Sequence, residues 1–398
     1  MKFKLYYPSI FLILIFHATF ITFPYWNYYD YFKYLILFIV ALFLLFNYKV
    51  IFNKRYKKVN LILLLYLCSV IISSYINKDN ELSRNVFLSS IVYGVRIFET
   101  FFLFEYFSLN KREKNLIDVL YNLLFIYIIL SDGLMLIKPT LHIEKGMYYL
   151  VGNKFTISYL HLQWIVLYLQ KNKDKTFLRT RKGISLLFHF FIALIMCIYV
   201  DCSTGIIGLF TLLLLFLVSR KNEYILRKPR SILTVLAISS SILLIFRGLL
   251  KSRVVAFIIE DILSADLTLT GRTPIYDNIG KVLQGHMLFG YGIGSSFDVV
   301  MKMIGAPNTQ NGILECVLEQ GMISTVLLLM LIYVIFKEIK MSSSRLSILF
   351  IIYIYAVLSS VEITIDTSFI TFLALLLACG LVNAKSKKGL KIFNVKIT

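Results

Sequence analysis

The sequence predicts an all-α, polytopic membrane protein of about 12 transmembrane helices with one large extracytoplasmic loop. Of its 398 residues, 58% are hydrophobic and only 16% are charged, a balance foreign to water-soluble globular proteins. The apolar residues form long blocks separated by short basic stretches. A helix of roughly 20 apolar residues crosses the hydrocarbon core because its backbone groups bond to one another where water is absent. We therefore treat residues 1–398 as a single integral membrane domain.

Twelve apolar blocks are the candidate spans, with edges set to within a few residues. They lie near residues 8–24, 34–47, 59–75, 86–107, 116–137, 155–169, 184–200, 203–219, 231–250, 322–336, 346–361 and 367–382. The first block follows a basic start and lacks a small-x-small cleavage site. We expect it to be retained as a signal anchor.

The basic residues follow membrane sidedness. If the amino terminus is inside, alternation of the spans places about 29 of the 42 Lys and Arg in the cytoplasm. The cytoplasmic basic stretches are 49–58, 111–114, 171–182, 220–230, 337–345 and 385–396. The formal charge of +20 is therefore an orientation signal and not a nucleic-acid footprint, and both termini are expected in the cytoplasm.

The Cys and His residues of this sequence show no pattern typical of a metal site or a disulfide framework. The five Cys include no CxxC pair, and the five His are scattered without the spacing of zinc ligands. We expect no metal site, no disulfide framework and no cofactor.

One connection is much longer than the others. Residues 247–321 join the ninth span to the tenth, and the charge pattern places them outside. Long ordered loops usually carry function. Within this loop we expect a short amphipathic helix over 277–283, a tight glycine turn over 290–294 and a helix over 311–320.

Three motifs follow one another in this loop. They read TGRTPIY at 270–276, LFGYGIG at 288–294 and NTQNGILE at 308–315, and the last leads to EQG at 319–321. In this order they resemble the O-antigen polymerase and ligase family of bacterial surface-polysaccharide assembly. Weaker similarity lies in GNK at 152–154 and STG at 203–205. The family often has His before the Asn of the third motif, where this chain has Gln310.

The resemblance implies a repeat-unit polymerase. Such an enzyme transfers a growing glycan from undecaprenyl diphosphate to a new lipid-linked repeat unit, in O-antigen, capsule or exopolysaccharide synthesis. It implies a metal-independent glycosyltransferase of the bacterial cytoplasmic membrane, with the outer loop folded over a central cavity. The expected partners are undecaprenyl-diphosphate-linked oligosaccharide and a chain-length regulator and flippase of the same pathway, with no nucleic acid.

Two other functions stay open. A ligase would pass the finished chain to another acceptor, although Gln310 in place of His weakens that interpretation. A flippase or transporter of lipid-linked oligosaccharide would also have about 12 helices, but transporters usually show two related halves and short outer loops. No such halves are apparent in this chain.

Two arginines are candidates for holding the diphosphate. Arg272 in the first motif could grip it through two hydrogen bonds, or only fix the loop to lipid phosphates. Arg96 lies in the middle of the fourth apolar block, where a charge costs on the order of 2.5–3.5 kcal/mol. Glu99 is on the same helix face, so Arg96 either pairs with it or faces the cavity and binds diphosphate.

Further cations are expected on the outer side. Arg253 belongs to a basic cluster with Arg247 and Lys251 where the ninth span ends, and Lys154 stands at another outer entrance. Such residues either anchor helices to head groups or guide an anionic carrier to the site.

The remaining candidates are carboxylates and amides of the loop. Glycosyl transfer to a hydroxyl gains from a general base, and Asp266 and Asp277 bracket Arg272. Pairing with Arg272 is the alternative for both carboxylates. Asn311, beside Gln310, could bind a sugar or the diphosphate, or it could cap the helix that follows.

Overall fold

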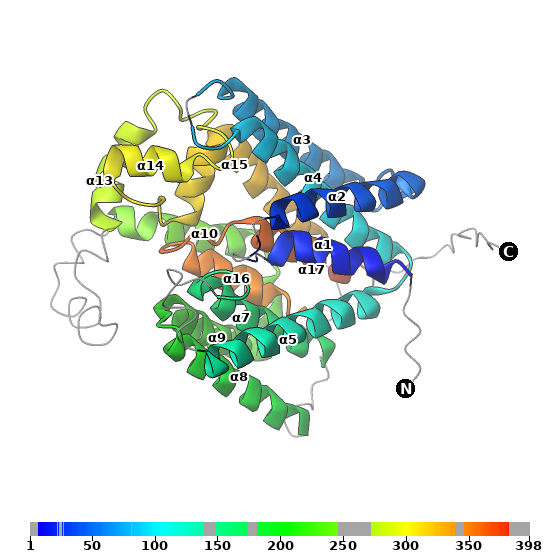
Figure 1. Ribbon diagram of the computed structural model, residues 1–398. Helices are drawn as coiled ribbons and strands as arrows, with labels where there is room; N and C mark the ends of the chain where they lie inside the picture. Colours follow the sequence, from blue (N-terminus) through cyan, green and yellow to red (C-terminus); the bar gives the residue numbers. More distant parts are fainter. Residues whose placement is uncertain are drawn as a thin grey trace.

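The protein is described here from a computed structural model. The structure describes residues 7–21, 23, 26, 28–80, 82–138, 149–172, 181–245, 272–339 and 346–381. This part of the chain is all-α, with 14 α-helices, one 3₁₀ helix (Tyr48–Val50) and no β-strand (Figure 1). The α-helices are α1 (Ser9–Phe20), α2 (Tyr29–Phe46), α3 (Lys57–Ile76), α4 (Val86–Leu109), α5 (Glu113–Ile137), α7 (Lys154–Lys171), α8 (Arg181–Tyr199), α9 (Ser203–Leu226), α10 (Pro229–Ile245), α13 (Arg272–Val282), α14 (Ser296–Ile304), α15 (Gly312–Ile339), α16 (Leu349–Leu358) and α17 (Thr367–Gly380).

Seven of these helices are long and apolar enough to cross a membrane: α2, α3, α4, α5, α8, α9 and α15. Three shorter apolar helices, α1, α16 and α17, have 12, 10 and 14 residues. Each predicted apolar block coincides with one helix. The all-α fold is therefore confirmed and the seven apolar helices support a membrane protein, but seven helices, not 12, meet the criteria for a span within the described chain.

The outer helices expose apolar side chains, and the inner ones bury them. On α8, Leu187, Phe188 and Phe191 are each about 60% exposed (61, 63 and 59%), whereas nearly all of α16 and α17 is buried. α15 packs along α3, α17 along α4, and α7 against α5 and α8. Apolar faces of this extent are suited to lipid and not to water.

The connections between helices separate into two groups. At one end, bonds join Ser83 to Asp298 (2.7 Å), Lys154 to the Asp201 carbonyl (2.7 Å) and Gly312 to the Ser359 carbonyl (2.9 Å). At the other end, bonds join Lys171 to Asp118 (2.7 Å), Leu346 to Glu223 (3.0 Å) and Ser347 to Gln170 (2.7 Å). These are the two groups that alternation of the spans places on opposite sides.

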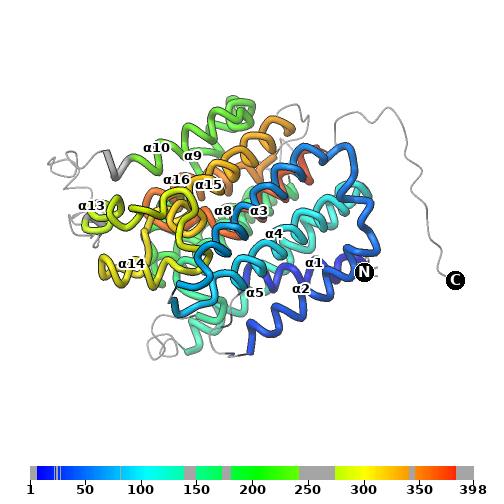
Figure 2. Tube along the Cα trace, turned by 90° about the horizontal axis from the view of Figure 1, so that it is seen from above, coloured from blue at the N-terminus to red at the C-terminus, as the bar shows by residue number. Residues whose placement is uncertain are grey.

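A cap built from α13, α14 and the start of α15 lies at the first of these ends (Figure 2). It has a small hydrophobic core of its own, to which each of the three helices contributes: Ile279, Val282, Leu283, Val299, Val300, Val317 and Leu318. The helix predicted over 277–283 is thus present as α13, but it begins earlier, at Arg272.

α15 is broken at Gly321, whose φ of 79° and ψ of 168° are not helical. Residues 287–294, here called the glycine loop, fill the break. The N–H of Tyr291 donates to the Leu318 carbonyl (2.8 Å), and the N–H of Met322 donates to the Met287 carbonyl (2.9 Å). The backbone groups that the break leaves without helical partners are therefore paired by the loop.

Two glycines make this close approach possible. A Cβ on Gly290 would lie 2.6 Å from the Leu318 carbonyl oxygen, and one on Gly321 would overlap the backbone of Leu288 and Phe289. Both residues, with Gly292 and Gly294, have positive φ, which glycine adopts without steric strain. The predicted glycine turn is confirmed, and its function is backbone-to-backbone packing against α15.

We predict that Gly321→Ala lowers the free energy of unfolding by at least about 2 kcal/mol, because the added methyl group meets backbone atoms at a positive φ. The matched control is Gly280→Ala in α13, where a Cβ meets nothing within 4 Å. In a helix that exchange should be neutral or stabilise by roughly 0.5–1 kcal/mol. Thermal unfolding in detergent compares the two variants, and equal midpoints would contradict the role assigned to Gly321.

Candidate functional site

Two carboxylates of α15, the buried Glu315 and the half-buried Glu319, hold the ends of α14 in place. The N–H of Gly294, just before α14, donates to Glu319 Oε1 (3.0 Å). After α14, the N–H and hydroxyl of Thr309 donate to Glu315 Oε2 (3.2 and 2.7 Å). Both glutamates lie one turn apart on the segment of α15 before its break. They are structural supports of the cap.

The cap is also tied to the turn between α16 and α17, residues 359–366. The Tyr276 hydroxyl of α13 donates to the carbonyl groups of Gln310 (3.3 Å) and Ser360 (3.4 Å). Gly312, the first residue of α15, donates its N–H to the Ser359 carbonyl. The motif at 308–315 therefore positions the cap on this turn.

Asn311 is the cap residue of α15. Its side-chain oxygen accepts from the N–H of Leu314 (3.1 Å), and its amide donates to the Ser240 carbonyl (3.3 Å). The side chain is fully buried. Of the two roles predicted for Asn311, the helix cap is the one that the structure forms. Gln310 precedes it with a φ of 48°, a left-handed conformation that is uncommon for a residue with a side chain.

Arg96 is not neutralised by Glu99. Within the described chain no ion pair joins them, and both carboxyl oxygens of Glu99 are buried without a hydrogen-bond partner. Among the described residues, Asp30 acts electrostatically on Arg96, followed by Tyr34, Tyr93 and Tyr29. The predicted pair along the helix is therefore wrong, and the Nε of Arg96 is buried without a hydrogen-bond partner among the described residues.

Asp30, Tyr93, Arg96 and Asp366 influence one another electrostatically and are here called the central polar cluster. Asp30 is largely exposed and also pairs with Lys33 (3.3 Å). Tyr93 shares a hydrogen bond with the Tyr66 hydroxyl (2.7 Å), which in turn donates to Gln320 of α15 (2.9 Å). Asp366 also acts electrostatically on Tyr93, which links the carboxylate to the cluster.

Asp366 stands just outside α17, where its carboxylate accepts from the N–H of Phe369 (3.0 Å). Its side chain is exposed, although many protein atoms lie around it. This crowding raises the pKa of the Asp366 carboxyl to about 6, and the backbone N–H bonds act in the opposite direction.

The other predicted residues are dispersed. Lys154 begins α7 and donates to the Asp201 carbonyl, with Asp201 Oδ2 at 3.7 Å, so it holds the turn between α8 and α9. Asp277 lies on the exposed side of α13. Arg272 begins α13, and its side chain, like Asp266 and Arg253, lies outside the described residues. The structure thus brings Asp277, Gln310 and Asn311 into the cap and leaves Arg96 and Lys154 on other helices.

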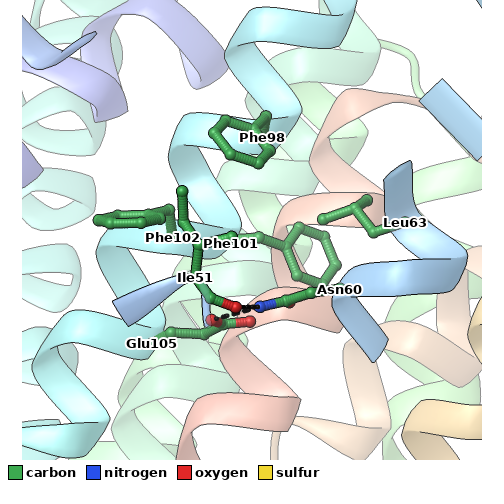
Figure 3. Close-up of a pocket in the computed structure, with 7 residues that line it drawn as sticks. All are labelled: Ile51, Asn60, Leu63, Phe98, Phe101, Phe102 and Glu105. Carbon is green, nitrogen blue, oxygen red and sulfur yellow. Dashed lines mark hydrogen bonds between the residues drawn. The ribbon is translucent and has the colours of Figure 1, made fainter. Parts of the chain in front are cut away.

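A small cavity at the opposite end of the bundle is too small for a sugar. It is lined by Ile51, Asn60, Leu63, Phe98, Phe101, Phe102 and Glu105 (Figure 3). The Asn60 amide donates to Glu105 Oε2 and to the Ile51 carbonyl, both at 3.1 Å. The volume of about 10 Å³ holds at most one water.

Within the described chain, no group of three or more His, Cys, Asp or Glu side chains could hold a metal ion. Comparison of the sequence and structure with family profiles, curated proteins and solved structures gives no match. The site is therefore interpreted from its own residues.

We predict that Glu319→Ala lowers the free energy of unfolding by about 1–3 kcal/mol, because the N–H of Gly294 loses its acceptor. Glu319→Gln keeps an oxygen at that position and should lose much less. The difference between the thermal unfolding midpoints of the two variants in detergent measures how much the hydrogen bond between Gly294 and Glu319 stabilises the protein. If the two variants unfold together, the carboxylate does not support the cap.

Proposed function

We propose that this chain is a repeat-unit polymerase of lipid-linked glycans in the bacterial cytoplasmic membrane. It transfers a growing chain from undecaprenyl diphosphate to a newly delivered lipid-linked repeat unit, as a metal-independent glycosyltransferase. The products are O-antigen, capsule or exopolysaccharide chains. In this proposal all 12 apolar segments cross the membrane, both termini are cytoplasmic and the cap faces outward.

One observation carries the proposal: Arg96 is a charged group inside an apolar bundle that no carboxylate of its own helix neutralises. A charge at this depth costs on the order of 2.5–3.5 kcal/mol unless it is paired or serves a ligand. A guanidinium donates two parallel hydrogen bonds to phosphate oxygens and keeps its charge. Arg96 would hold the diphosphate that leaves when the glycosyl bond breaks.

Asp366 is the proposed general base for the attacking sugar hydroxyl. A carboxylate whose pKa is about 6 is ionised at neutral pH and accepts a proton more readily than an ordinary aspartate. It would take the proton from the attacking sugar hydroxyl, and Asp277 would contact the glycan from the cap. Arg272 and Lys154, with Arg253, remain proposed contacts for the anionic carrier.

The test uses purified protein in liposomes supplied with undecaprenyl-diphosphate repeat units, with the glycan length distribution as readout. We predict a ladder for the native chain and a loss of rate of about 10- to 100-fold for Arg96→Ala, which removes a charge-assisted contact of about 1.5–3 kcal/mol. Arg272→Ala tests the cap arginine in the same assay. The control is Arg220→Ala, which removes an exposed arginine at the other end of the bundle.

Two results would overturn this proposal. A full ladder from folded Arg96→Ala would remove the arginine from the site. No ladder from the folded native chain would exclude the polymerase, and assays with a non-polymer acceptor and with labelled repeat unit in sealed vesicles would then test the ligase and the flippase.

A further inference from the structure

The cap presents three consecutive apolar side chains that nothing in the described chain covers. Met287, Leu288 and Phe289 are 53, 60 and 38% exposed. They form the tip of the glycine loop, here called the apolar tip. In an extramembrane segment, such a run would normally be buried or replaced by polar residues.

The backbone of the tip is held rigidly. The carbonyl groups of Met287 and Leu288 accept from the N–H groups of Met322 (2.9 Å) and Ile323 (3.4 Å), beyond the break in α15. On the other side, the Phe289 carbonyl accepts from the hydroxyl of Ser73 in α3. The three side chains therefore project outward from a backbone that hydrogen bonds hold in place on both sides.

These bonds also fix the depth of the tip. Ser73 lies in the last turn of α3, and Met322 and Ile323 begin the long second segment of α15; both helices are candidate spans. The tip therefore sits between the ends of two spans, at the level where they leave the hydrocarbon.

The tip continues apolar faces that are already exposed on those helices. On α15 the exposed side chains below it are Ile323, Val326, Met330 and Tyr333, and on α3 they are Leu61, Leu64, Leu65, Ile72, Tyr75 and Ile76. Lys78 and Lys281 are exposed just beyond, where head-group phosphates would lie. The tip thus adjoins two helices that expose apolar side chains along their length, and Lys78 follows directly after the end of α3.

We infer that the apolar tip is a membrane anchor of the cap: Met287, Leu288 and Phe289 insert among lipid acyl chains at the boundary with the head groups. This inference does not rest on the proposed function, because it concerns the lipid bilayer and no substrate. Its consequence is that the cap is held against the membrane surface.

Spin labelling in liposomes tests the anchor, and the chain supplies its own references. Cys68 on α3 is the one exposed cysteine in the described chain, so its label reports lipid. In a Cys68→Ser background, a spin label on Leu288→Cys measures the environment of the tip. A label on Asp79→Cys, in the exposed turn after α3, serves as the reference for a site in water. Met287→Cys repeats the measurement at a neighbouring position, in case one label perturbs the loop.

We predict that the ratio of oxygen to hydrophilic nickel-chelate accessibility at Leu288→Cys lies below that at Cys68, in the interior of α3, and clearly above that at Asp79→Cys, by roughly several-fold, because a polar reagent is excluded from hydrocarbon. Ready access of the nickel chelate at both tip positions would overturn the inference. So would protection from both reagents, which would mean that residues 246–271 or a second copy of the chain covers the tip.

Discussion

The break in α15 is the constraint on which the rest of this end of the molecule depends. In a bilayer every backbone polar group must find a partner within the protein, and a helix interrupted at Gly321 leaves several without one. The glycine loop supplies those partners, and this requires backbone contact that only Gly290 and Gly321 permit. Once the loop is fixed there, Ser73 and Asn77 of α3 donate hydrogen bonds to its carbonyl groups. Glu315 and Glu319 then hold the two ends of α14 by accepting hydrogen bonds from Thr309 and Gly294.

The sequence predicts the helices on either side of Gly321, but not the loop that fills the break between them. Apolar blocks predict each described span helix because lipid imposes the same requirement along the whole segment. The glycine turn and the cap at Asn311 are also local, since both depend on residues close in sequence. Gly321 stands between two helical patterns, and nothing in its neighbours indicates that residues 30 positions earlier fill the gap.

The polar cluster could not be predicted because its members come from α2, α4 and the turn before α17. Spacing along α4 favours Glu99 as the partner of Arg96, yet Asp30 is the acidic group that acts on it. Asp366 stands in the short connection between two apolar blocks, and no motif in the sequence singles it out.

The bonds around the cap join it to the helix bundle on several sides. The cap is joined to α3 through the glycine loop and to the turn at 359–366 through Tyr276 and Gly312, and Glu315 and Glu319 of α15 hold the two ends of α14. Moving α13 and α14 away from the bundle would break these bonds together and separate their side chains from Val317 and Leu318 of α15 in the shared apolar core. The described cap is therefore a rigid part of the helix bundle.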